Sequence, residues 1–161
     1  MAKKLIPIRP VKAHVKGEMS PLDRVRNTVF KCGIVGGLHM RLKTLTRKKV
    51  TAEMRIRAIH LNHNGRVNGG ALMAFADIIG SAGASMNRPA RYRGGTIESK
   101  TNFFAPGLPP VIHAVSIPLH IGRTTSVWQT TLSNTDGRVI AITTQTQIVL
   151  PPEPSAAPAD E

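Results

Sequence analysis

The spacing of hydrophobic side chains predicts a strand over residues 48–58, which have the sequence KKVTAEMRIRA. Apolar residues occupy every second position there, and the positions between them are charged or polar. A period of two places one set of side chains on each face, which is typical of a half-buried antiparallel strand. The preceding segment GLHMRLKTL, residues 37–45, is the predicted partner strand.

Four later segments are rich in β-branched residues and predict further strands. They cover residues 96–105, 111–121, 124–134 and 138–150. The motif NTDG, at Asn134–Gly137, joins the last two segments and is a strong hairpin signal. This order predicts a mostly antiparallel sheet. Three large aromatic residues lie in the same region, namely Phe103, Phe104 and Trp128. They are predicted to be core residues, with the lining of a ligand pocket as the less common alternative for one of them.

Residues 70–84 differ from the strands because Ala, Leu, Met, Ile and small residues fill them without alternation. This composition predicts a helix that is buried on nearly all sides. A shorter amphipathic helix is predicted from the N-cap Ser20 to Gly33. One long buried helix among antiparallel strands predicts an α+β fold in which the sheet wraps around the helix.

The length of 161 residues suits one domain. The folded part is predicted at residues 20–150, after a basic flexible arm at 1–19 and before a disordered Pro-rich tail at 151–161. The single Cys32 leaves no partner for an internal disulfide, and it is predicted to be a small core residue. No apolar run reaches the roughly 18 residues of a membrane span, and the N-terminus has no secretory pattern. These features predict a cytoplasmic protein.

The formal net charge of +13 raises the alternative of a nucleic-acid-binding protein. Residues 1–50 contribute +11, and residues 51–150 contribute +5 before the acidic tail subtracts 3. Only 4% of the residues are aromatic, which is few for a surface that stacks bases. The arm is therefore interpreted as a solvated extension, and neither nucleic acid nor a membrane is expected as a partner.

Asp77 lies within the apolar run Val67–Met86. Burying an ionised carboxylate is costly unless a partner compensates it. Asp77 is therefore either a structural residue satisfied by a neighbouring hydroxyl or Arg, or a general base in an apolar site. The helix begins at Asn68–Gly70, where unpaired backbone N–H groups can polarise a carbonyl oxygen. The two groups lie ~10 Å apart along the helix axis, so a two-fold related subunit is needed to bring them together.

The stretch NHNGRVNGGALMAFAD, residues 62–77, resembles the signature of hot-dog-fold acyl-CoA thioesterases of the phenylacetic-acid-degradation type. That signature is N-x-x-G-x-x-H-G-G, followed by an Asp seven residues after the second Gly. The positions in register are Asn62, Gly65, Gly69, Gly70 and Asp77. The similarity continues through TIESKTNFFAPG and the last hairpin, and it covers residues 34–150.

This resemblance implies a hot-dog fold and an enzyme that hydrolyses an acyl-CoA thioester to a free acid and CoA. Asp77 would act as general base or nucleophile, and the backbone N–H of Gly69 would polarise the carbonyl. Asn62 would position the substrate or a water, and Thr96 would hold the water. Such sites lie between two subunits, so a homodimer or homotetramer is expected, with no metal and no cofactor.

One departure from the family pattern is Asn68, which stands where the signature has the His of H-G-G. Asn is a favoured N-cap and can shape the start of the helix, but it lacks an imidazole. The alternative function is therefore a non-catalytic hot-dog protein that binds an acyl-CoA or a related ligand.

Candidate substrate-binding residues flank the helix at both ends. They are Asn68 and Gly70 at its start and, in the cluster RPARYRGG after its end, Arg91 and Arg93 with the neighbouring Arg88. Guanidinium groups suit the diphosphate and 3′-phosphate of CoA. A solvated loop of the same composition is equally common.

His60 and His63 have a spacing that metal ligands can adopt. No cluster of Cys or carboxylate residues accompanies them in the sequence. A metal site is therefore not predicted.

Overall fold

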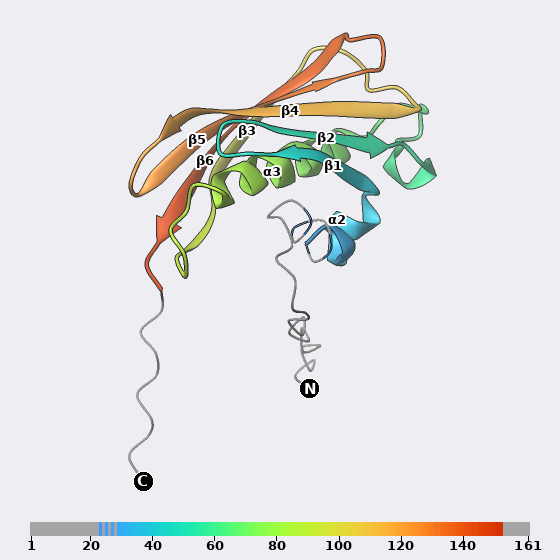
Figure 1. The fold of residues 1–161 in the computed structure, drawn as a ribbon. Coiled ribbons are helices and arrows are strands. Elements are labelled where there is room, and N and C mark those ends of the chain that lie inside the picture. Colours follow the sequence, from blue (N-terminus) through green and yellow to red (C-terminus); the bar gives the residue numbers. More distant parts are fainter. Residues whose placement is uncertain (1–22, 24, 26, 28, 153–161) are drawn as a thin grey trace, which may run out of the picture.

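The computed structural model describes residues 29–152 together with residues 23, 25 and 27. The predicted arm at 1–19, the N-cap Ser20 and most of the predicted tail lie outside the described residues. Six strands and one long helix make up most of the described chain (Figure 1). No helix in this part of the chain has the length and apolar character needed to cross a membrane.

The six strands form one antiparallel sheet in the order β1-β2-β4-β5-β6-β3. Their bounds are Met40–Leu45 for β1, Val50–Arg55 for β2, Arg93–Phe103 for β3, Val111–Ile121 for β4, Thr125–Ser133 for β5 and Val139–Leu150 for β6. Every predicted strand is present, although β2 ends three residues before the predicted end. The chain leaves β2 there because the Ile56 N–H bonds to the Pro110 carbonyl and Ala58–His60 forms a 3-10 turn, η2.

Helix α3, Gly69–Ser85, packs against the inner face of this sheet (Figure 1). The predicted helix is confirmed, with bounds within one residue at each end, and so is the α+β arrangement. Six of its seventeen residues are buried, so among the described residues the helix is covered along one face rather than on nearly all sides. Trp128 is fully buried between the two layers, as predicted. Two glycines of α3 permit the close packing, since a Cβ at Gly83 would overlap the Trp128 ring and one at Gly80 would overlap the Gln145 amide.

Strand β3 forms one edge of the sheet and, among the described strands, pairs only with β6. Ten of its eleven residues are exposed. Phe103 is 49% exposed and the next residue, Phe104, 58%. The prediction that these two are core residues is wrong, because they lie where the edge strand ends and no second layer within the described residues covers them. A long exposed edge offers unpaired backbone groups to another chain.

The single helix predicted over residues 20–33 does not continue unbroken to Gly33, and residues 20–22, 24, 26 and 28 lie outside the described residues. The described pieces are helical residues at 23, 25 and 27, the 3-10 turn η1 (Val29–Lys31) and helix α2 (Gly33–Gly37). Gly33 begins α2 rather than ending a helix, and its φ of +54° is one that glycine adopts without strain. Cys32, just before it, is exposed, so its predicted placement in the core is wrong.

Candidate active site

Asp77 lies in the middle of α3, half-buried, on the side that faces β3 and β6. Its Oδ1 accepts a hydrogen bond from the Thr96 hydroxyl of β3 at 2.9 Å and from Gln145 Nε2 of β6 at 3.2 Å. Both donors are neutral, and no described residue donates to Oδ2. One carboxylate oxygen is therefore held by the protein, while the other is available to a substrate or water.

A second layer of polar groups orients Thr96. Gln147 Nε2 donates to Thr96 Oγ1 at 2.6 Å and to Ser81 Oγ at 3.1 Å. Because Thr96 Oγ1 accepts from Gln147, its own proton is left to point at Asp77. Gln145, Gln147 and Ser81 are not among the residues predicted from the sequence. The sequence signal that could have identified Gln145 and Gln147 is the motif QTQ, which places two buried amides at alternate positions of β6.

A cavity of about 390 Å³ lies beside Asp77. Its apolar wall is formed by Val25, Phe30, Val35, Ile78 and Ala82. Its polar lining includes Ser81, Ser85, Arg88, Thr96 and Gln147. The volume lies within the ~300–1,000 Å³ typical of small-ligand pockets. The carboxylate thus faces a space that suits a mainly apolar group.

The N-terminus of α3 is capped by Asn68. Its side-chain Oδ1 accepts the Gly70 N–H at 2.7 Å, which is the usual role of an N-cap Asn. Among the described residues, none accepts the Gly69 N–H. The ring of Phe103 lies close by, 3.3 Å from where a Cβ on Gly69 would stand. A free N–H at a helix start, with no side chain in front of it, can donate to an oxygen that carries negative charge.

Within one chain, these donors and Asp77 do not share a cavity. Asn68 and Gly70 line a separate space of about 410 Å³, together with His60. Among the described residues, Asn62 makes no hydrogen bond with Asp77 or with the Gly69 N–H. Its side-chain oxygen instead accepts the N–H groups of Asn64 and Arg66 and closes its own loop.

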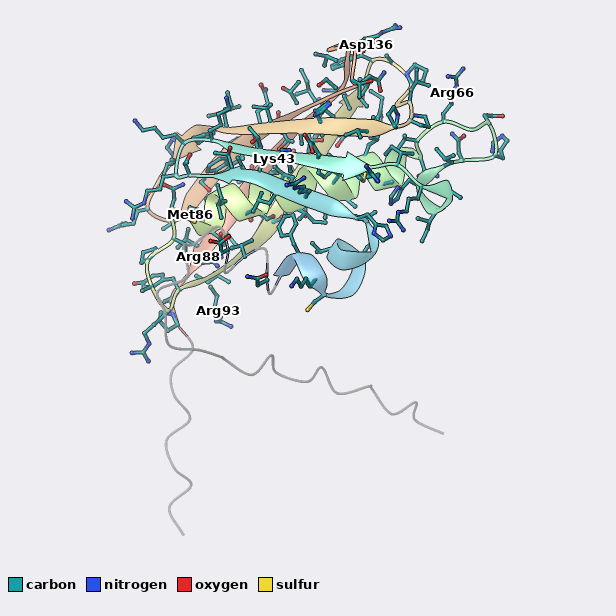
Figure 2. The ribbon with its side chains drawn as sticks, turned by 45° about the vertical axis from the view of Figure 1, so that its right-hand side comes forward. Lys43, Arg66, Met86, Arg88, Arg93 and Asp136 are labelled. Carbon is teal, nitrogen blue, oxygen red and sulfur yellow. The ribbon has the colours of Figure 1, made fainter. Side chains whose placement is uncertain are left out.

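The predicted phosphate clamp is only partly near the Asp77 cavity. Arg91 and Arg93 are exposed and do not line it, whereas Arg88 does. Figure 2 shows Arg88 and Arg93 in the same region, where α3 ends and β3 begins. Arg88 is thus the arginine of this cluster that faces the same space as the carboxylate.

His60 is buried beside the helix N-terminus, with 1% of its surface exposed. Its Nδ1 accepts the Arg57 N–H at 3.0 Å, and its Nε2 has no partner among the described residues. Burial lowers the pKa of His60 below its usual value, and the neighbouring His39 and Arg57 charges lower it further. The imidazole is therefore neutral near pH 7, with its proton on Nε2.

A curved antiparallel sheet packed on one long central helix is the hot-dog fold, and here the helix carries a hydrogen-bonded carboxylate beside a cavity. The sequence profile of the thioesterase superfamily matches residues 64–141. A Vibrio cholerae protein named as a candidate esterase, VC_A0580, is 24% identical over 135 residues, which are 83% of this chain and 89% of that protein.

Solved structures of thioesterases share this fold. A mutant of thioesterase PA1618 from Pseudomonas aeruginosa is 26% identical and superposes with a TM-score of 0.76, covering 84% of this chain and 97% of that one. Thioesterase HI1161 from Haemophilus influenzae is 18% identical, with a TM-score of 0.79 over 88% of this chain and 98% of that one. The fold is therefore that of hot-dog thioesterases, and the comparisons support the thioesterase superfamily and, in general, a thioester hydrolase.

Proposed function

We propose that this protein hydrolyses acyl-CoA thioesters to a free acid and CoA. The observation that carries the proposal is the Asp77 carboxylate, which is half-buried beside a mainly apolar cavity and held through Oδ1 by Thr96 and Gln145. Oδ2 has no hydrogen-bond donor among the described residues, so it is available to take a proton from a water molecule.

In the proposed reaction, Asp77 Oδ2 accepts a proton from a water molecule as that water attacks the thioester carbonyl carbon. A C–O bond forms, and the carbonyl oxygen becomes negatively charged. Collapse of this intermediate breaks the C–S bond, and the CoA thiolate takes up the proton. Thr96 keeps the carboxylate oriented throughout. Asp77 could also attack the carbonyl directly, with water then hydrolysing the resulting anhydride.

The proposed donor to the carbonyl oxygen is the Gly69 N–H of a second subunit. Helix α3 runs from Gly69, beside Phe103, to the region of Thr96, so it is antiparallel to β3. If β3 pairs with its own copy about a two-fold axis, the Phe103 end of one strand lies beside the Thr96 end of the other. That pairing moves one subunit's Gly69 toward the other's Asp77.

The exposed edge of β3 supports a homodimer of this kind, or a dimer of dimers. Asn62 and Asn68 would then contribute to the half of the site that surrounds the helix N-terminus. Arg91 and Arg93 remain candidates for the CoA phosphates because they are exposed and lie just before Gly94, which lines the Asp77 cavity. CoA thioesters are intracellular metabolites, which agrees with the proposed cytoplasmic location.

The test is release of free thiol from a panel of acyl-CoAs by the wild-type protein and by Asp77→Asn. The substitution should lower turnover by about 100-fold or more, in the range for loss of a general base, while the fold is retained. Asp136→Asn is the matched control, since this carboxylate lies in the β5–β6 hairpin, far from Arg88 in Figure 2. Tight acyl-CoA binding without turnover by the wild-type protein would favour the non-catalytic alternative, for which Asn68 is the motivating residue.

A further inference from the structure

The cavity beside Asp77 has a cation at its other end. Asp77, Ser81, Ser85 and Arg88 follow one another at helical spacings of four, four and three residues, and all four line the cavity. Asp77 and Arg88 are separated by roughly 16 Å along this face, taking the helical rise of ~1.5 Å per residue through the capping turn. The cavity is thus an elongated space with a carboxylate near one end and a guanidinium near the other.

The Arg88 side chain packs against the first residues of β3. It is half-buried, whereas Arg91 and Arg93 are exposed. Its Nη1 lies against the backbone of Gly94, where a Cβ would stand 2.6 Å away, so the glycine provides the room for the guanidinium. No carboxylate pairs with Arg88 among the described residues. A half-buried guanidinium with unused N–H donors favours an anionic ligand.

Apolar side chains lie along the space between the two charged groups. Phe30, Val35 and Ile78 are among the residues that form this wall. Methylene groups gain free energy against such a wall, whereas the amides of the pantetheine arm would leave their polar groups without partners there. The wall therefore favours the acyl chain over CoA as the occupant.

We propose that the cavity selects acyl groups that end in a carboxylate and that Arg88 binds this terminal carboxylate. The substrate class is then the CoA monothioester of a dicarboxylic acid. This inference rests on the proposed function, because it takes the thioester carbonyl to lie at Asp77. The anion at Arg88 has one other source, a CoA phosphate, which every acyl-CoA carries.

The test compares suberyl-CoA with octanoyl-CoA, which have acyl chains of equal length and the same phosphates. The measured quantity is the ratio of kcat/KM for the two thioesters. The wild-type protein should prefer suberyl-CoA, and Arg88→Gln should lower the ratio by about tenfold or more, as expected for loss of a charged hydrogen bond. Arg88→Lys should keep most of the preference. Arg138→Gln, in the exposed β5–β6 hairpin, is the control and should leave the ratio unchanged.

Two results would overturn the inference. One is a wild-type preference for octanoyl-CoA, and the other is an equal loss on both thioesters in Arg88→Gln, which would assign the anion to a CoA phosphate. Calorimetric binding of the two thioesters to Asp77→Asn provides a readout without hydrolysis. A preference for suberyl-CoA that needs Arg88 would support the inference even if no thioester is hydrolysed. Hydrolysis of both thioesters with no effect of Arg88 would remove the inference and leave the proposed function.

Discussion

Gln145 holds Asp77 through two contacts, because its Nε2 lies 3.1 Å from the Asp77 backbone carbonyl and 3.2 Å from Oδ1 of the same residue. One buried amide on β6 thus fixes both the helix backbone and the side chain of the proposed base. Replacing it should disturb the orientation of the carboxylate rather than the affinity for substrate.

Gln145→Leu keeps a side chain of similar size but removes this donor. We expect kcat to fall by about tenfold, with a smaller change in KM, because the Asp77 carboxylate loses one of the hydrogen bonds that orient it. Gln129→Leu is the matched control, because Gln129 lies on β5 between the buried Trp128 and Thr130 and so faces away from α3. A larger change in KM than in kcat would show that Gln145 acts mainly on substrate binding.

The packing of α3 against the sheet makes Gly83 sensitive to substitution. Gly83→Ala places a methyl group inside the space of the Trp128 ring, which is fully buried. Such overpacking costs about 1–3 kcal/mol, so thermal denaturation should show a Tm lower by several degrees. Gly37→Ala is the control, because a Cβ there has no neighbour within 4 Å. Equal Tm values for the two variants would contradict the tight packing described here.

Acid should destabilise the fold partly through His60. The pKa of His60 is lowered in the folded state, so below its ordinary value of 6.5 the unfolded chain binds the proton more strongly. The contribution of neutral His60 to stability is complete above pH 6.5, and it is lost as the pH falls from there toward the folded-state pKa. Tm should therefore drop between about pH 7 and pH 5.

His60→Gln should make this drop in Tm smaller, because glutamine can accept the Arg57 N–H but does not titrate. His63→Gln is the control, since His63 is exposed. The measurement is Tm against pH for the three proteins at constant ionic strength. An unchanged pH dependence in His60→Gln would assign the acid sensitivity to other groups.

The proposed sharing of the site between two subunits predicts complementation between defective subunits. Asp77→Asn lacks the base, and Gly69→Val obstructs the proposed oxyanion donor, so each homodimer should be nearly inactive. After the two proteins are unfolded and refolded together in equal amounts, half of the dimers are mixed, and each mixed dimer has one intact site. Activity should recover to about a quarter of the wild-type value. No recovery, in dimers shown to be mixed by mass spectrometry, would place both groups in one chain.

Sequence patterns were sufficient for the six strands and the long helix, but not for the pieces before β1 or for the contacts between elements. The alternation in β2 and the apolar run of α3 predict these elements because burial of one face requires them. The family resemblance pointed to both Asp77 and Thr96, but it assigned Thr96 to holding a water, and the hydrogen bond from Thr96 to Asp77 was not predicted. Gln145 was missed because its role depends on the pairing of β6 with β3 and on the depth at which α3 packs. The sequence position of a polar residue on the inward face of a strand does not indicate which residue it will hydrogen-bond to.

The exposed placement of Phe103 could not be predicted for a related reason. Its hydrophobicity indicates burial, but the side chain lies at the end of an edge strand, and no second layer within the described residues covers it. Single-chain patterns predict that an apolar residue will be covered. They do not say whether the covering surface belongs to its own subunit.

The wall of the Asp77 cavity has a further consequence for how this protein can change its specificity. The groups proposed for the chemistry belong to α3, β3 and β6, while Val25, Phe30 and Val35 come from the short pieces that precede the sheet. These pieces supply none of the hydrogen bonds to Asp77. Substitutions in them can therefore lengthen, shorten or reshape the proposed acyl pocket without moving the carboxylate, so that new substrates become accessible to evolution or engineering while the groups proposed for hydrolysis are kept.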